Sequence, residues 1–100
     1  MTFEECARAF LTYCEVERAL SPNTLIAYAD DLRHFTRFAL PEIGANFHPF
    51  QVDKQLIRKF IVQLRQRGLH VATIQRRINC LRSFWHFLVE NSIEVSVSLT

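Results

Sequence analysis

Residues 71–90 read VATIQRRINCLRSFWHFLVE and repeat apolar side chains at intervals of three and four residues. An α-helix turns by about 100° per residue, so such intervals gather the apolar side chains on one face. The predicted buried face holds Ile74, Ile78, Leu81, Trp85 and Leu88. The predicted opposite face is polar, short-chained and basic, and consists of Thr73, Arg76, Asn79, Cys80 and Ser83. We therefore expect a long helix over residues 71–90 with one side in the core.

Three earlier segments show the same periodicity, at about residues 3–19, 22–40 and 54–67. Each follows a residue that caps helices well: Thr2, with Glu5 in the spacing of a capping box, then Ser21 before a proline, and Asp53. Pro41 should stop the second helix near residue 40, since proline interrupts helices. Gly68 should close the third, since glycine accepts the left-handed conformation.

The composition agrees with a single helical domain. The chain has 100 residues, 49% of them hydrophobic and 22% charged, which suffices for one core and argues against disorder. Only two glycines and three prolines are present, too few for the many turns of a β-sandwich or small barrel. The predicted fold class is all-α.

Cysteine content and the N-terminus predict a cytoplasmic protein. Three cysteines are an odd number and too few for a disulfide framework, which suits a reducing compartment. The first residues lack a basic segment followed by an apolar one, and no apolar run is long enough to cross a membrane. We expect neither a signal peptide nor a membrane partner.

Charge is distributed unevenly along the chain. Residues 1–50 hold four basic and seven acidic side chains, a net of −3, whereas residues 51–100 hold eight and three, a net of +5. No Asp or Glu occurs between Lys54 and Val89. This asymmetry indicates an anionic partner, nucleic acid first, although a solvated basic face would give the same pattern.

The residues predict no catalytic or metal site. The acidic pairs Glu4/Glu5, Glu15/Glu17 and Asp30/Asp31 are helical neighbours that do not face each other, and we interpret them as solvated surface. The histidines and cysteines lack the spacing of metal ligands, and no glycine-rich phosphate loop is present. Cys80 is a lone thiol, which suits packing better than nucleophilic attack. We expect a non-catalytic chain without cofactor or metal.

Two helix features suit a DNA duplex. Ser21, Asn23 and Thr24 place small polar groups at the positive end of the second helix, where a phosphate can bind, although simple capping explains them equally well. In the fourth helix, Thr73, Arg76, Asn79 and Ser83 form one stripe. Arginine can pair with guanine or phosphate, and asparagine can read adenine.

These residues also carry a family resemblance. LSPNT at residues 20–24, followed by Tyr28, Asp31-Leu32 and Phe35, resembles the second-helix region of tyrosine recombinases of the phage-integrase and Xer type. A second block resembles that family's fourth helix and comprises Gly68-Leu69, Thr73-Ile74, Arg77-Ile78, Leu81-Arg82-Ser83-Phe84 and Phe87-Leu88.

The resemblance implies the N-terminal core-binding domain, a SAM-like bundle of four or five helices that clamps one face of duplex DNA. Relatives present their second and fourth helices to the major groove, while a separate catalytic domain performs strand exchange. The implied DNA contacts are Ser21, Asn23, Thr24, Thr73, Arg76, Arg77, Asn79 and Ser83. Arg82 also matches, but its helical angle places it beside the apolar stripe.

Two departures and one alternative accompany the resemblance. His70 stands where relatives usually have a capping serine, which could weaken the start of the helix or make it pH-sensitive, and the Asn-Pro that often follows the fourth helix is missing.

We expect a core-binding domain over residues 1–91 and an extended tail or linker over 92–100, leading to a catalytic domain. Expected partners are double-stranded DNA and other recombinase protomers. The alternative is a helical protein-interaction module.

Overall fold

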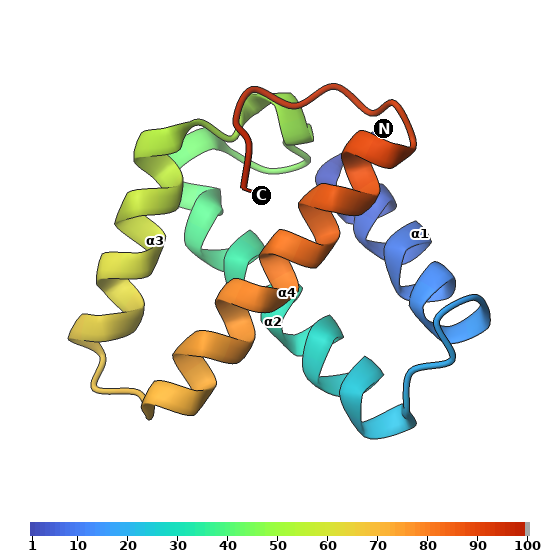
Figure 1. Cartoon of the computed structure of the whole chain (residues 1–100). Helices are drawn as coiled ribbons and strands as arrows, with labels where there is room; N and C mark the ends of the chain where they lie inside the picture. Colours follow the sequence, from blue (N-terminus) through green and yellow to red (C-terminus); the bar gives the residue numbers. More distant parts are fainter. Residues whose placement is uncertain (100) are drawn as a thin grey trace.

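The computed structural model describes residues 1–99 of the chain (Figure 1). It contains four α-helices and one short 3-10 helix, and no strand among the described residues: α1 (Phe3–Val16), α2 (Pro22–Ile43), η1 (Pro49–Gln51), α3 (Lys54–Gln66) and α4 (Val71–Glu90). The predicted all-α bundle is confirmed.

The two longest helices, α2 and α4, cross near their middles, with α1 on one side and α3 on the other (Figure 1). At the crossing, Sγ of Cys80 lies 3.8 Å from the carbonyl oxygen of Tyr28. Both α1 and α3 contact α2 as well as α4. The core therefore lies along the crossed pair and is closed from two sides.

The predicted helix starts are confirmed by their caps. Thr2 and Glu5 form a reciprocal capping box, in which each backbone N–H donates to the other residue's side chain. Oγ of Ser21 accepts from Thr24 N at 3.3 Å, and Oδ1 of Asp53 accepts from Leu56 N at 2.8 Å. These bonds satisfy amide groups that the first turn of a helix leaves unpaired.

Two predicted helix ends were wrong. α1 stops at Val16 instead of about residue 19, because Ala19 takes a positive φ of 50° and turns the chain toward α2. α2 continues through Pro41 to Ile43, because a proline in the last turn removes only one of the remaining backbone donors. Gly44 then closes the helix with φ 86°, its N–H donating to Leu40 O.

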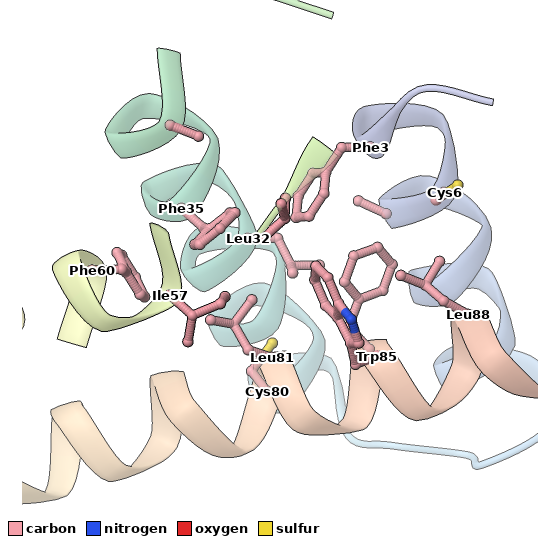
Figure 2. Close-up of a cluster of buried hydrophobic side chains, with 14 of the residues drawn as sticks. Phe3, Cys6, Leu32, Phe35, Ile57, Phe60, Cys80, Leu81, Trp85 and Leu88 are labelled. Carbon is pink, nitrogen blue, oxygen red and sulfur yellow. The ribbon is translucent and has the colours of Figure 1, made fainter. Parts of the chain in front are cut away.

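The core is dominated by aromatic side chains from all four helices (Figure 2). Phe3 of α1 packs against Phe35 of α2 and edge-on against Phe84 of α4, with ring centroids 5.4 and 5.1 Å apart. On the α3 side, Phe60 meets Phe35 edge-on at 5.0 Å. Each such buried side chain contributes roughly 1.5–3 kcal/mol, so these contacts fix how the helices pack.

The buried face of α4 is wider than the sequence predicted. Cys80 has no exposed surface, although its helical angle suggested the polar face. Phe84 is equally buried, and Arg77 is only 7% exposed. The reason is that α4 contacts α1, α2 and α3, so neighbours cover more of its circumference than one apolar stripe.

Residues 92–99 lie against the bundle. They contain no strand, and the alternating side chains of Ile93, Val95, Val97 and Leu99 are partly buried against the core. The indole Nε1 of Trp85 donates to Val97 O at 3.1 Å, and the Ser96 hydroxyl donates to Phe50 O. In Figure 1 this segment crosses over the bundle and returns toward α3. Its role as a linker stays a prediction, and residue 100 lies outside the described residues.

Candidate nucleic-acid interface

α4 presents a row of exposed polar side chains along its full length. Gln75, Asn79, Arg82 and His86 follow at intervals of four, three and four residues and are all exposed. Nε2 of Gln75 donates to Oδ1 of Asn79 at 3.2 Å. The helix has no acidic residue before Glu90, and Glu90 pairs with His86 at 3.5 Å, so Arg82 is the charged side chain of this row that has no acidic partner within α4.

Arg82 belongs to this row, contrary to its predicted position beside the apolar stripe. The predicted buried face did not include Arg77, Cys80 and Phe84, which are buried in the structure. These residues lie on the side of the helix away from Arg82, so the centre of the buried face is further from Arg82 than the sequence predicted. Sequence reasoning could have found this shift from Phe84 and Cys80, two apolar residues four apart.

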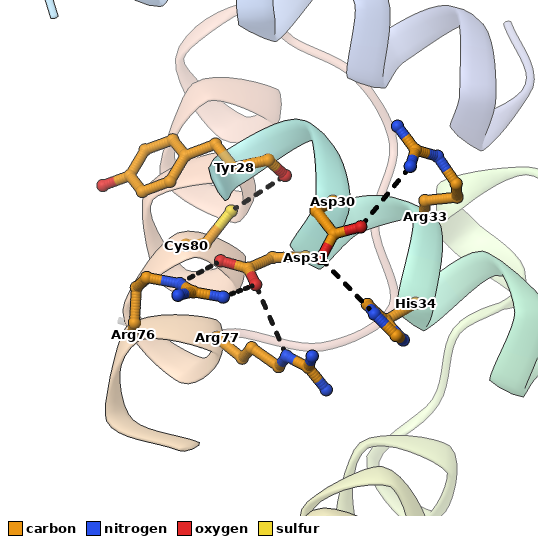
Figure 3. Close-up of polar contacts among 8 residues, drawn as sticks. All are labelled: Tyr28, Asp30, Asp31, Arg33, His34, Arg76, Arg77 and Cys80. Carbon is orange, nitrogen blue, oxygen red and sulfur yellow. Dashed lines mark hydrogen bonds and ion pairs between the residues drawn. The ribbon is translucent and has the colours of Figure 1, made fainter. Parts of the chain in front are cut away.

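Arg76 lies at the edge of the row and is held by Asp31 of α2 (Figure 3). Its Nε lies 3.0 Å from Oδ2 and its Nη2 lies 2.7 Å from Oδ1, a bidentate geometry. The side chain of Arg76 is 41% exposed, whereas that of Asp31 is 1% exposed. The hydrogen bonds that Arg76 donates to Asp31 raise the pKa of Arg76, so the guanidinium keeps its charge.

This pairing leaves part of the guanidinium available. Nε and one N–H of Nη2 point to Asp31, whereas the Nη1 amino group and the other Nη2 hydrogen are not used by it. Arg76 can therefore offer its outer end to a phosphate or a base edge while Asp31 fixes its orientation.

The same carboxylate draws Arg77 into the interior. Nε of Arg77 lies 3.4 Å from Oδ1 of Asp31, an ion pair without a hydrogen bond, and the side chain is 9% exposed. A side chain that contacts a DNA groove must be exposed, and the guanidinium of Arg77 is buried. This burial is unfavourable to the predicted DNA contact by Arg77.

The interpretation of Asp31 as solvated surface was wrong. Asp31 occupies the inner face of α2, three residues after Tyr28 and four before Phe35, and that position in the helical repeat was the available clue. Its neighbour Asp30 does lie outside, where it pairs with Arg33 at 3.4 Å and with His34 at 3.4 Å.

At the start of α2, the predicted site residues serve partly as caps. Ser21 and Asn23 are exposed and Thr24 is half-buried. Ser21 Oγ accepts from the Thr24 amide and lies 3.0 Å from the Thr24 hydroxyl. Asn23 makes no hydrogen bond through its side chain within the described part of the chain, so its amide faces solvent.

Along α4, Thr73 and Ser83 are half-buried and Asn79 is exposed, so none of them is covered by the bundle. Ser83 accepts a hydrogen bond from Nη1 of Arg18 at 2.8 Å, which connects the end of α1 to the middle of α4. Sequence reasoning missed Arg18, because its partner Ser83 lies 65 residues further along the chain.

The structure does not bring all predicted residues into one tight cluster. The first turn of α2 lies at the lower right of the crossed pair in Figure 1, and the first turn of α4 lies at the lower left. Thr73 and Asn23 therefore belong to different corners of the surface, while Arg76 lies near the crossing and contacts α2 through Asp31. The candidate interface is a long, open face, as a rod-like ligand requires.

Residues 1–99 contain free cysteines, no metal-binding group and no membrane-spanning helix. The three cysteines are free and buried, and burial raises the pKa of the Cys80 thiol, which keeps it protonated and a poor nucleophile. No group of His, Cys, Asp or Glu side chains in this range could hold a metal ion. None of the helices in the described range is both long and apolar enough to cross a bilayer.

Sequence comparisons give relatives for most of the chain. The tyrosine recombinase XerC of Pelobacter propionicus is 38% identical over 85 residues, which cover 85% of this chain and 28% of that protein. XerC of Escherichia coli O157:H7 is 37% identical over 83 residues, covering 83% of this chain and 27% of the relative. XerC of Pelotomaculum thermopropionicum is 32% identical over 87 residues, covering 84% and 28%.

This chain thus spans little more than a quarter of the length of the curated relatives it matches. No solved structure matches it. Residues 7–92 match the family described as "Phage integrase, N-terminal SAM-like domain". The match covers all of α2, α3 and α4 and most of α1. The chain therefore belongs to the phage-integrase N-terminal SAM-like domain family and is homologous to the N-terminal part of the tyrosine recombinase XerC.

Proposed function

We propose that this domain binds duplex DNA and positions the catalytic domain of a site-specific tyrosine recombinase for DNA integration or recombination. The observation that carries this proposal is the exposed face of α4, which has no acidic residue before Glu90 and at whose edge Arg76 is held by the buried Asp31. Membership of the SAM-like family supports the same function. Such a domain acts where DNA is, which agrees with the cytoplasmic location expected from the sequence.

The proposed contacts come from the predicted set, with one removed and one added. Arg76, Asn79, Ser83 and Thr73 of α4 remain, together with Ser21, Asn23 and Thr24 at the start of α2. Arg77 is left out because it is buried, and Arg82 is included because it is exposed.

Most of the binding free energy should come from phosphates. If three to five side chains neutralise phosphates, the logarithm of the association constant should fall with the logarithm of salt concentration with a slope of about −3 to −4.5. Isolated binding by one domain should then be weak, on the order of micromolar.

The test is a fluorescence anisotropy titration of a labelled duplex of mixed sequence with the 100-residue chain, repeated at several salt concentrations. Arg76→Ala should weaken binding about 5- to 10-fold, since it removes a charged donor from the interface. Arg8→Ala is the matched control: it also removes one exposed charge, but from the surface between α1 and α2. No binding by the parent chain at low salt would refute the proposal, and equal binding by both variants would remove Arg76 from the interface.

A second candidate function, protein interaction, is favoured by two exposed apolar side chains. Val16 at the end of α1 is 70% exposed and Ile26 on α2 is 68% exposed. Ile26 also lines a shallow cavity between these helices, together with Leu11 and Leu25. Another recombinase protomer could dock there while the α4 face holds DNA. Apolar docking would respond little to salt, which separates it from DNA binding.

A further inference from the structure

An open cavity lies between the end of α1 and the second half of α4, and Ser83 is the one residue of its lining that belongs to the DNA contacts predicted from the sequence. Its volume is about 760 Å³, and its polar lining consists of Arg18, Arg82, Ser83, His86, Glu90 and Asn91. It is large enough for a phosphate group with accompanying water. Arg82 and His86 on its wall belong to the exposed row of α4, so the cavity continues that face toward α1.

Two arginines in this cavity lack an acidic partner. Within residues 1–99, no carboxylate lies within 4.0 Å of the guanidinium of Arg18 or Arg82. Glu90 is the one acidic residue in the lining, and it pairs with His86 at 3.5 Å. The cavity therefore keeps a net positive charge from its two arginines whether or not His86 is protonated.

Ser83 orients one of these arginines. Its Oγ accepts the hydrogen bond from Nη1 of Arg18 at 2.8 Å, which holds a side chain from the α1–α2 connection against α4. Because the serine oxygen is the acceptor, its own hydroxyl hydrogen can still be donated to a ligand. The remaining N–H groups of Arg18 are also available, since Ser83 uses only one of them.

We propose that this cavity binds one backbone phosphate of duplex DNA, with Arg18 and Arg82 as the charged donors and Ser83 as the neutral donor. The inference rests on the proposed DNA-binding function and assigns to it a contact from outside α2 and α4. A planar guanidinium group can donate two parallel hydrogen bonds to two oxygens of one phosphate. Because the donors come from two different segments of the chain, they can converge on one position for that phosphate. The bound phosphate would then tie the end of α1 to the same duplex that lies along α4.

The test compares Arg18→Gln, Arg82→Gln, the double variant and the charge-matched control Arg8→Gln in anisotropy titrations at several salt concentrations. Each single variant should bind a duplex about fivefold more weakly than the control does. One phosphate contributes about 0.9 to the salt slope, so the double variant should lose about 0.9 in total. Circular dichroism melts of all four variants show whether the fold is kept.

A second measurement does not depend on substitutions. In ¹H–¹⁵N spectra of the parent chain, the side-chain Nε–H signals of Arg18 and Arg82 should shift on addition of the duplex, and that of Arg8 should not.

The outcomes separate this site from the proposed function. If the parent chain binds DNA but the cavity variants behave like Arg8→Gln and the Arg18 and Arg82 signals stay in place, the phosphate site is refuted and the function stands. A slope loss of about 1.8 in the double variant would mean two separate phosphates and would overturn the shared site. A parent chain that binds no duplex at all would remove the function itself.

Discussion

At the scale of single residues, Asp31 is the polar group on which α4 most depends. It lies 2% exposed in the bundle and faces two arginines from a helix 45 residues further along the chain. A buried carboxylate is stable only when charges or donors surround it. Arg76 and Arg77 supply them, and the exposed end of Arg76 is oriented as a result.

Asp31→Asn should lower the free energy of unfolding by about 3 kcal/mol, because Arg77 would remain buried without a counter-charge. Urea denaturation followed by circular dichroism measures this change. The control is Asp30→Asn on the neighbouring residue, whose carboxylate is 45% exposed and whose loss should cost less than about 0.5 kcal/mol. Equal stability of the two variants would contradict the structural role assigned to Asp31.

At the scale of elements, α4 begins with an unusual cap. Nδ1 of His70 accepts from the Ala72 amide at 3.0 Å, so an imidazole performs a capping task for which serine is a preferred residue. The expected weak start is therefore at least partly compensated. Nδ1 accepts this bond through its lone pair, so it carries no hydrogen in this structure.

Replacing this cap should change the first turn of α4 selectively. His70→Ala should cost about 1 kcal/mol, whereas His70→Ser should keep most of the parent stability, because serine can accept the same bond. Urea denaturation gives the overall change, and amide hydrogen exchange at Ala72 and Thr73 reports local fraying. If the alanine variant is as stable as the serine variant, the hydrogen bond from Ala72 contributes nothing.

At the scale of the whole molecule, the last described residues close the core over Trp85. The indole of Trp85 is 1% exposed, and its N–H donates to the carbonyl oxygen of Val97. The alternating sequence pattern around Val97 did not predict which part of the bundle this segment would contact. Burying this alternating segment is favourable, but ordering its backbone costs entropy of similar size.

A chain shortened to residues 1–92 should therefore lose only about 1–2 kcal/mol in stability, because these two contributions nearly cancel. It should also show a red-shifted fluorescence maximum, since Trp85 is the only tryptophan and becomes hydrated. Glu94→Gln, at an exposed position of the same segment, should change neither quantity. An unchanged emission maximum in the shortened chain would show that these residues do not cover Trp85.

The sequence by itself determined the four helices, the N-terminal caps of the first three and the closing Gly68, because these features depend on residues within one or two turns of each other. The packing of α1, α2 and α4 against one another decided the rest. It buried Asp31 and Arg77, removed Cys80 from the polar face and joined Arg18 to Ser83. Such contacts link residues far apart in the chain, and their partners are set by how helices pack in space, which local periodicity does not encode.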